Sequence, residues 1–270
     1  MDKLICINSL TNLKTVDIII NWKTRLDIIL ANYGQQIKQL NLSLDDELED
    51  DSNNFKTLRD CLSQMQQLKQ LAISLPVDFG TDQTVQLLTT IGRRCRQLLE
   101  FSYSSNETSI DLIIQIFVTI TEHISPKLRR LSLNCWPISG EESNYDEELV
   151  VITSGSLKRF YRLTHLTLRV GYWGIIGDQF FRDIHCNLPR LQYIRCFESS
   201  ITDESIQAMV QLVHLMDIYL LCDPNKLMTT EIISIISNQL LIDSNIKHLF
   251  IEYWLSKQMQ KDFVCGKYDI

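Results

Sequence analysis

The chain has 270 residues, which is enough for one or two domains whose hydrophobic core needs neither disulfides nor metal. Its 26 Lys and Arg residues against 33 Asp and Glu residues give a net charge of −7, which argues against a dedicated nucleic-acid binder, because such binders gain affinity by neutralising phosphates. Its 45% apolar content excludes disorder, and it has neither a membrane-spanning apolar run nor a signal-peptide pattern. We therefore expect a folded cytoplasmic or nuclear protein that binds neither nucleic acid nor membranes.

A six-residue pattern, apolar-x-x-apolar-x-apolar, recurs nine times along the chain. The copies begin at Leu13, Ile37, Leu68, Leu98, Leu128, Leu163, Leu191, Leu215 and Ile246. Successive copies are 24 to 35 residues apart, and this regular spacing indicates an internal repeat. Apolar residues alternate with others at the end of each copy, which predicts a short strand with one buried face.

Segments with helical spacing lie between many of the predicted strands. Apolar residues recur every three or four positions in residues 55–65, 84–91, 111–124, 205–212 and 231–236. We expect N-cap residues at Thr81 or Asp82, Ser109, Thr202 and Thr229. The first and seventh repeats have only 24 residues and therefore have room only for short helices.

A unit of one strand and one helix cannot bury both of its apolar faces alone. Stacked units place the strands in one parallel sheet and the helices in a second layer. Because a helix is about 10 Å wide and neighbouring strands are about 4.8 Å apart, the stack curves with the sheet inside. We therefore predict an α/β horseshoe solenoid of about nine strand–helix repeats, with a parallel sheet on the concave side and helices on the convex side.

The strand pattern Leu-x-x-Leu-x-Leu in a repeat of about 30 residues resembles leucine-rich repeats of the long, ribonuclease-inhibitor-like type, over about residues 13–254. The segment from Cys95 to Tyr103 is similar to the cysteine-containing subclass of these repeats, and Ile201-Thr202-Asp203 is similar to the start of its helices. This subclass is typical of F-box leucine-rich proteins, which are substrate receptors of cullin-RING ubiquitin ligases. The resemblance implies a leucine-rich-repeat domain over residues 1–254 and a C-terminal tail over residues 255–270.

The resemblance also implies a protein–protein interaction module, the substrate-recognition region of an F-box-type ubiquitin ligase receptor. No F-box is visible in residues 1–36, which already contain the first repeat, so the ligase adaptor is expected as a partner only where an F-box lies outside this chain. The alternative is a stand-alone scaffold or inhibitor without any ubiquitin role. A third reading is a ligand sensor with a pocket beneath the concave rim. We expect a monomer.

Signatures of catalysis and of metal binding are absent from the sequence. The glycine spacing in residues 171–177 is wrong for a dinucleotide loop, and no serine-hydrolase or zinc-protease motif occurs. None of the eight cysteines forms a Cys-x-x-Cys pair, so we interpret them as small buried residues in a reducing compartment. We expect no enzyme activity, no cofactor and no metal.

Binding side chains are expected on the concave face, at the strand positions between the buried apolar residues. From the fifth strand onward these positions hold large planar or cationic side chains, which are enriched at protein interfaces. The predicted partner-binding residues are Arg130, His165, Arg169, Tyr193, Arg195, Phe197, Tyr219 and Phe250. Arg169 with Arg195 would suit an acidic or phosphorylated segment. A preference of aromatic residues for strands is the alternative explanation of this face.

Two acidic segments, residues 45–51 and 141–148, are predicted to follow strands on one rim of the horseshoe. We interpret both as solvated loops, with a docking rim for a basic partner as the alternative.

Overall fold

A computed structural model describes most of the repeat region. The described residues are 15–20, 35–44, 52–76, 79–106, 108–136, 152–170, 176–199, 201–222 and 248–253. The predicted helix at 231–236 with its N-cap Thr229, the acidic segments 45–51 and 141–148, and the tail 255–270 lie outside the described residues.

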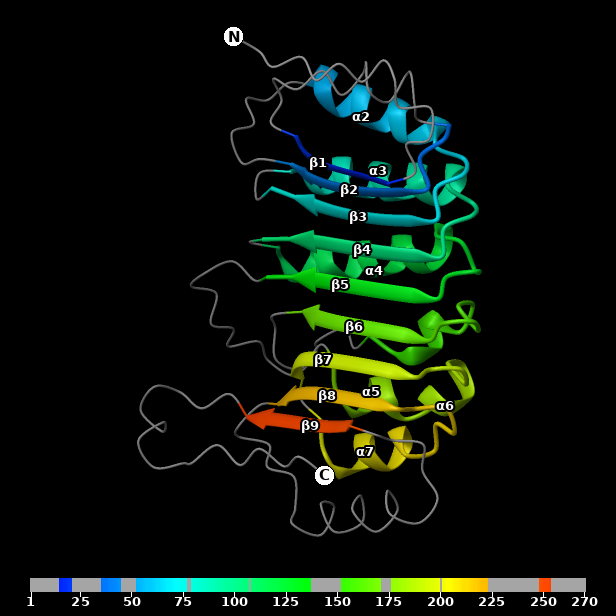
Figure 1. Ribbon diagram of the computed structural model, residues 1–270. Helices are drawn as coiled ribbons and strands as arrows, with labels where there is room; N and C mark the ends of the chain where they lie inside the picture. The colour runs from blue at the N-terminus through cyan, green and yellow to red at the C-terminus, as the bar shows by residue number, and fades with distance from the viewer. Residues whose placement is uncertain are drawn as a thin grey trace.

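Nine parallel strands form one sheet whose spatial order is the order of the chain (Figure 1). The strands are β1 (Thr15–Ile20), β2 (Gln39–Leu44), β3 (Gln70–Leu75), β4 (Glu100–Ser105), β5 (Arg130–Cys135), β6 (His165–Val170), β7 (Tyr193–Ser199), β8 (Asp217–Cys222) and β9 (His248–Tyr253). Each begins two residues after the first apolar residue of a sequence copy, so the predicted strands and their parallel pairing are confirmed.

The helices lie behind the sheet on one of its faces (Figure 1). They are α2 (Ser52–Gln64), α3 (Thr81–Arg94), α4 (Ile110–His123), α5 (Asp178–Phe181), α6 (Ile184–Asn187) and α7 (Asp203–Met209). The predicted N-caps Ser109 and Thr202 are confirmed, because each side-chain oxygen accepts a backbone N–H of the following turn. The N-cap of α3 was expected at Thr81 or Asp82, but it is Gly80, without a side-chain bond. As expected for a short repeat, α7 has seven residues.

The layer behind β5, β6 and β7 differs from the predicted pattern of one helix per repeat. Among the described residues between β5 and β6 there is only a 3-10 helix, η1 (Ser154–Leu157), and α5 and α6 have four residues each. The sequence Ser154-Gly155-Ser156 disfavours an α-helix, because serine and glycine both have low helix propensity. The chain here covers the sheet with single turns.

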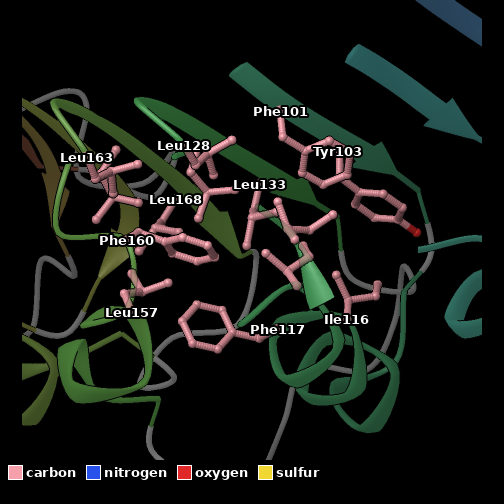
Figure 2. Packing of buried hydrophobic residues seen from close by; sticks show 14 of the residues in the cluster. Phe101, Tyr103, Ile116, Phe117, Leu128, Leu133, Leu157, Phe160, Leu163 and Leu168 are labelled. Carbon is pink, nitrogen blue, oxygen red and sulfur yellow. The ribbon is translucent and has the colours of Figure 1, made fainter. Parts of the chain in front are cut away.

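The core lies between the sheet and the helices. Alternate strand residues are buried, and Leu71, Leu133 and Leu168 are each at most 2% exposed. Figure 2 shows strand side chains pointing toward the helix layer, where Phe117 of α4 and Phe160 after η1 lie among them. Burying each such side chain contributes about 1.5–3 kcal/mol, which makes this continuous apolar layer the main source of stability.

Turns before the strands join consecutive repeats by a recurring backbone contact. The carbonyl of Leu99, just before β4, accepts the N–H groups of Arg129 and Arg130 at 2.7 and 3.1 Å. The carbonyl of Arg129 accepts the next two, from Thr164 and His165, at 2.8 and 3.0 Å. The same arrangement begins at Lys38 and extends to the N–H groups that start β8. It sets the starts of β2 to β8 at the same height in the sheet.

One half-buried carboxylate joins α5 to α7. Asp178, in the first turn of α5, accepts the backbone N–H of Thr202 at 2.8 Å and the Thr202 hydroxyl at 2.7 Å. It also accepts the hydroxyl of Ser205. Burial raises the pKa of Asp178, but the hydrogen bonds from Ser205 and Thr202 outweigh burial, so its pKa lies below the ordinary value.

Replacing Gly92 with alanine is expected to destabilise the fold. A β-carbon at this position in α3 would lie 2.5 Å from the carbonyl carbon and oxygen of His123 in α4. Alanine normally stabilises a helix relative to glycine by about 1 kcal/mol, so the clash reverses the usual sign. Urea unfolding of G92A should show a lower free energy of unfolding, whereas G80A, whose added carbon would meet nothing closer than 3.9 Å, should not. Equal stability of G92A and wild type would contradict this close approach.

Asp178→Asn is expected to change how stability depends on pH. A carboxylate whose folded pKa is depressed stabilises the fold above its unfolded pKa, about 3.9, and this part is lost as the pH falls through the folded value. The variant should therefore unfold more easily than wild type near neutral pH, and the difference should shrink below about pH 4. Thermal unfolding across this pH range is the measurement. The control Asp183→Asn, at the start of α6 and without a side-chain capping bond, should keep the wild-type pH dependence.

Candidate functional site

The strand register arranges the side chains opposite the helices in columns that cross the sheet. Arg130 of β5, His165 of β6 and Tyr193 of β7 are register partners and form part of the first column. The second column contains Ser132, Thr167, Arg195, Tyr219 and Phe250, and the third contains Asn134, Arg169 and Phe197. We call this face the outward face.

The structure places all eight predicted binding residues at outward strand positions. Arg130 and Arg195 are exposed, and His165, Arg169, Tyr193, Phe197 and Tyr219 are half-buried. Phe250 is the register partner of Tyr219 on β9, but its side chain is outside the described part of the structure. The contacts divide the seven described side chains between two neighbouring groups, a division that the spacing of the sequence did not predict.

A hollow of about 410 Å³ lies on the outward face over β2 to β7. Small side chains of the second column line it, including Ser102, Ser132 and Thr167. Larger side chains of the first column line it beside them, and Arg195 lines it from β7. We call this feature the hollow. The side chains that line it are Asn41, Gln70, Ala72, Glu100, Ser102, Arg130, Ser132, His165, Thr167, Tyr193 and Arg195. The apolar residues Leu71, Phe101, Leu131 and Leu166 lie behind them.

Contacts among its larger side chains fix the shape of the hollow. Arg130 Nε lies 3.8 Å from Glu100 Oε1, an ion pair in which the arginine remains 56% exposed. The rings of His165 and Tyr193 stack with their centroids 4.1 Å apart and their planes 19° apart. His165 Nδ1 is also 2.9 Å from the Thr164 hydroxyl. These contacts hold the imidazole before any partner arrives.

The pKa of His165 depends on the burial of its imidazole and on the charged side chains around it. Burial lowers its pKa below the ordinary value, and the neighbouring cations Arg130 and Arg195 lower it further. Asp217 opposes this shift from β8, two strands away, but does not cancel it. Burial is the largest of these causes and the two arginines act in the same direction, so the imidazole in the hollow favours its neutral form.

A second group of side chains, which we call the aromatic cluster, consists of Trp136, Arg169, Phe197 and Tyr219. The Arg169 guanidinium lies 3.6 Å from the Trp136 ring centroid and 5.2 Å from the Phe197 ring centroid. Phe197 in turn lies 5.2 Å from Tyr219, with the rings tilted by 43°. Each cation–π contact is worth about 0.5–2 kcal/mol, so Arg169 is held between two rings.

An irregularity between β7 and β8 accompanies the contact between Phe197 and Tyr219. Arg195 and Tyr219 are register partners, but the register shifts between Cys196 and Ser199. Phe197 therefore has no direct partner on β8 and packs diagonally on Tyr219 of the second column. The aromatic cluster joins the third column to the second in this way.

Trp136 is a member of this site that we did not predict. Its backbone N–H donates to the Ser105 carbonyl at 3.0 Å, and its carbonyl accepts the Thr108 N–H at 2.7 Å. This pairing continues the sheet beyond Cys135. Extending the alternation of β5 by one more step would have placed Trp136 on the outward face, beside Arg169.

The described residues offer no evident place for a metal ion. Their His, Cys, Asp and Glu side chains do not gather in groups of three or more that could ligate one. Within the same part of the chain, no helix has both the length and the apolar composition to cross a bilayer. The described side chains of the outward face can provide stacking, cation–π contact, hydrogen bonding and ion pairing.

Removing single charges should move the pKa of His165 in opposite directions. Arg130→Gln should raise the pKa, because it removes a cation that disfavours the imidazolium, and Asp217→Asn should lower it. NMR titration of the imidazole protons is the measurement. Arg129→Gln removes an exposed charge that does not act on His165 and should leave its pKa unchanged. If Arg130→Gln and Asp217→Asn both leave the pKa of His165 unchanged, these charges do not act on the imidazole in the hollow.

No protein-family model and no curated protein matches the chain, but its backbone is similar to several solved structures. A chain in the crystal structure of the yeast Rad7–Elc1 complex is 15% identical with a TM-score of 0.45, over 88% of this chain and 69% of that one. An internalin, InlF, of Listeria monocytogenes is 11% identical with a TM-score of 0.40, over 84% and 70%. The leucine-rich repeat-containing protein LegL7 of Legionella pneumophila is 12% identical with a TM-score of 0.42, over 89% and 83%.

Proposed function

We propose that the chain is a leucine-rich-repeat interaction module that binds a protein partner through the outward face of β4 to β8. In this proposal about nine strand–helix repeats form a horseshoe, and the outward face is its concave side. The proposal is supported by the one-repeat progression of strands, all parallel and in chain order, together with the leucine pattern of each strand.

The observation that carries the proposal is that the large side chains on this face are held in place by contacts with one another. Tyr193 and His165 stack on each other, and Trp136, Arg169 and Phe197 form a continuous stack. Tyr, Trp and Arg are the residue types that contribute most at interface hot spots. Side chains that are already held in one arrangement lose little conformational entropy on binding, which favours affinity.

We further propose that the partner is a ligase substrate and that the chain recognises it without catalysing a reaction. The support is the pattern beginning at Cys95 and the Ile201-Thr202-Asp203 helix start, both similar to the F-box leucine-rich subclass. The alternative, a scaffold or inhibitor, needs the same face but no ligase adaptor. Co-purification of the adaptor that binds F-boxes with the full-length protein favours the ligase role, and its consistent absence favours the alternative.

Substitutions on the outward face should weaken partner binding without unfolding the chain. A partner is first identified by proximity labelling and then titrated as a purified protein in a calorimeter. Arg195→Ala and Tyr219→Ala should each cost about 2 kcal/mol of binding free energy, because each removes a large contact side chain from the centre of the face.

Two variants away from the outward face serve as controls for this experiment. Arg190→Ala removes an exposed arginine from the turn before β7, and Val213→Ala removes an apolar side chain that is 70% exposed after α7. Both should bind as wild type does. Wild-type affinity of the Arg195 and Tyr219 variants, together with loss of binding when residues 45–51 or 141–148 are neutralised, would place the interface on the acidic segments instead.

A further inference from the structure

Two arginines reach the hollow from strands that are not neighbours. Arg130 begins β5 and Arg195 lies within β7, so β6 runs between them. Two strand spacings across the sheet and an offset of two residues along the strands separate their backbones by about 12 Å, a span that two arginine side chains can close from both sides. Both are exposed and both line the hollow, so a group bound above β6 is within reach of both guanidinium groups.

The positive charge of these arginines is only partly balanced by the protein itself. Arg130 has one acidic neighbour, Glu100, at 3.8 Å. Arg195 has no ion pair within the part of the chain that the structure describes. Our sequence interpretation paired Arg195 with Arg169, but Arg169 stacks on Trp136 and does not line the hollow. Arg130 therefore takes the place of Arg169 in the cation pair.

Hydroxyl groups lie between the two arginines. Ser132 and Thr167 line the hollow from the second column, and Thr167 is the register partner of both Ser132 and Arg195. A carboxylate has two oxygens in one plane, which suit one arginine, whereas a phosphate monoester has three terminal oxygens and nearly two negative charges. Three oxygens can meet two guanidinium groups on opposite sides and a hydroxyl below.

We propose that the hollow binds a phosphorylated serine or threonine side chain of the partner, between Arg130 and Arg195 and above Thr167. This inference rests on the proposed function, because it names the chemistry that the same face recognises. The hollow, about 410 Å³ in volume, is open to solvent along the outward face, so a side chain of a partner can enter it. The chain as a whole carries a charge of −7, so this local positive charge also orients an approaching anionic segment.

His165 provides an internal reporter of such binding. Its imidazole lines the hollow, and Arg130 and Arg195 lower its pKa. A phosphate between these arginines would offset their effect, and the pKa of His165 should therefore rise when phosphate binds. Glu100 and Asp217 flank the same column from β4 and β8 and are present in both states, so they do not mimic this rise.

The test compares three peptide mixtures that share random flanking residues and differ only in a central phosphoserine, serine or glutamate. The full chain should bind the phosphoserine mixture at least about tenfold more tightly than either of the others, as expected for charge-assisted hydrogen bonds from arginine. Arg130→Gln and Arg195→Gln should each remove about tenfold or more of that affinity. Arg190→Gln, which removes the same charge from an exposed turn, should bind as wild type does. The pKa of His165, followed by NMR, should rise with the phosphoserine mixture only.

Other outcomes would overturn the inference in distinct ways. Equal binding of the serine mixture would show that no anion is recognised, and equal binding of the glutamate mixture would assign the hollow to a carboxylate. An equal loss in Arg190→Gln would show general attraction to net charge. If the purified partner binds wild type and Arg195→Gln equally but is lost in Tyr219→Ala, the proposed function stands and the phosphate site does not.

Discussion

Six peptide carbonyls, one just before each strand from β2 to β7, each accept two backbone N–H groups from the following repeat. Together with the parallel ladder, these bonds start every strand at the same height. A slip by one residue would turn each buried leucine outward and each outward side chain into the core, so the register is strongly favoured. Because the register is constant, residues at one motif position form a column across the sheet. Both the core and the outward face follow from this repeated contact.

The sequence was a reliable guide wherever one physical signal dominated. Alternation marked the strands, because a buried leucine on one side and a polar residue on the other leave one possible register. Helical spacing likewise marked α2, α3, α4 and α7. Behind β5 and β6 the signal failed, since single turns such as η1 are too short to show a periodic apolar face. The N-cap of α3 was misplaced by one or two residues, because the helix begins directly after Gly80, which has no side-chain oxygen to mark it as a cap.

The candidate site was predictable as a set of positions but not as a set of contacts. Alternation placed Arg130, Arg169 and Arg195 on one face. It could not say which arginine stacks on an aromatic ring and which one lines the hollow. That division depends on Trp136, which lies beyond the last residue of β5, and on the register shift after Cys196. The register shift has no periodic signature, because it is a local departure from the repeat, and Trp136 becomes predictable only when the alternation of β5 is extended past Cys135.

The short elements between β5 and β7 bear on how the repeats of this chain can vary in length. A full helix tolerates a deletion poorly, because removing one residue rotates its apolar face by about 100° against the sheet. Single turns such as η1, α5 and α6 have no such phase to maintain. The starts of β5, β6 and β7 are accordingly 35 and then 28 residues apart, yet these strands remain in register. Insertions and deletions are thus tolerated best directly behind the strands that carry the proposed binding side chains, where the return path of the chain can vary while the columns of the outward face stay in place.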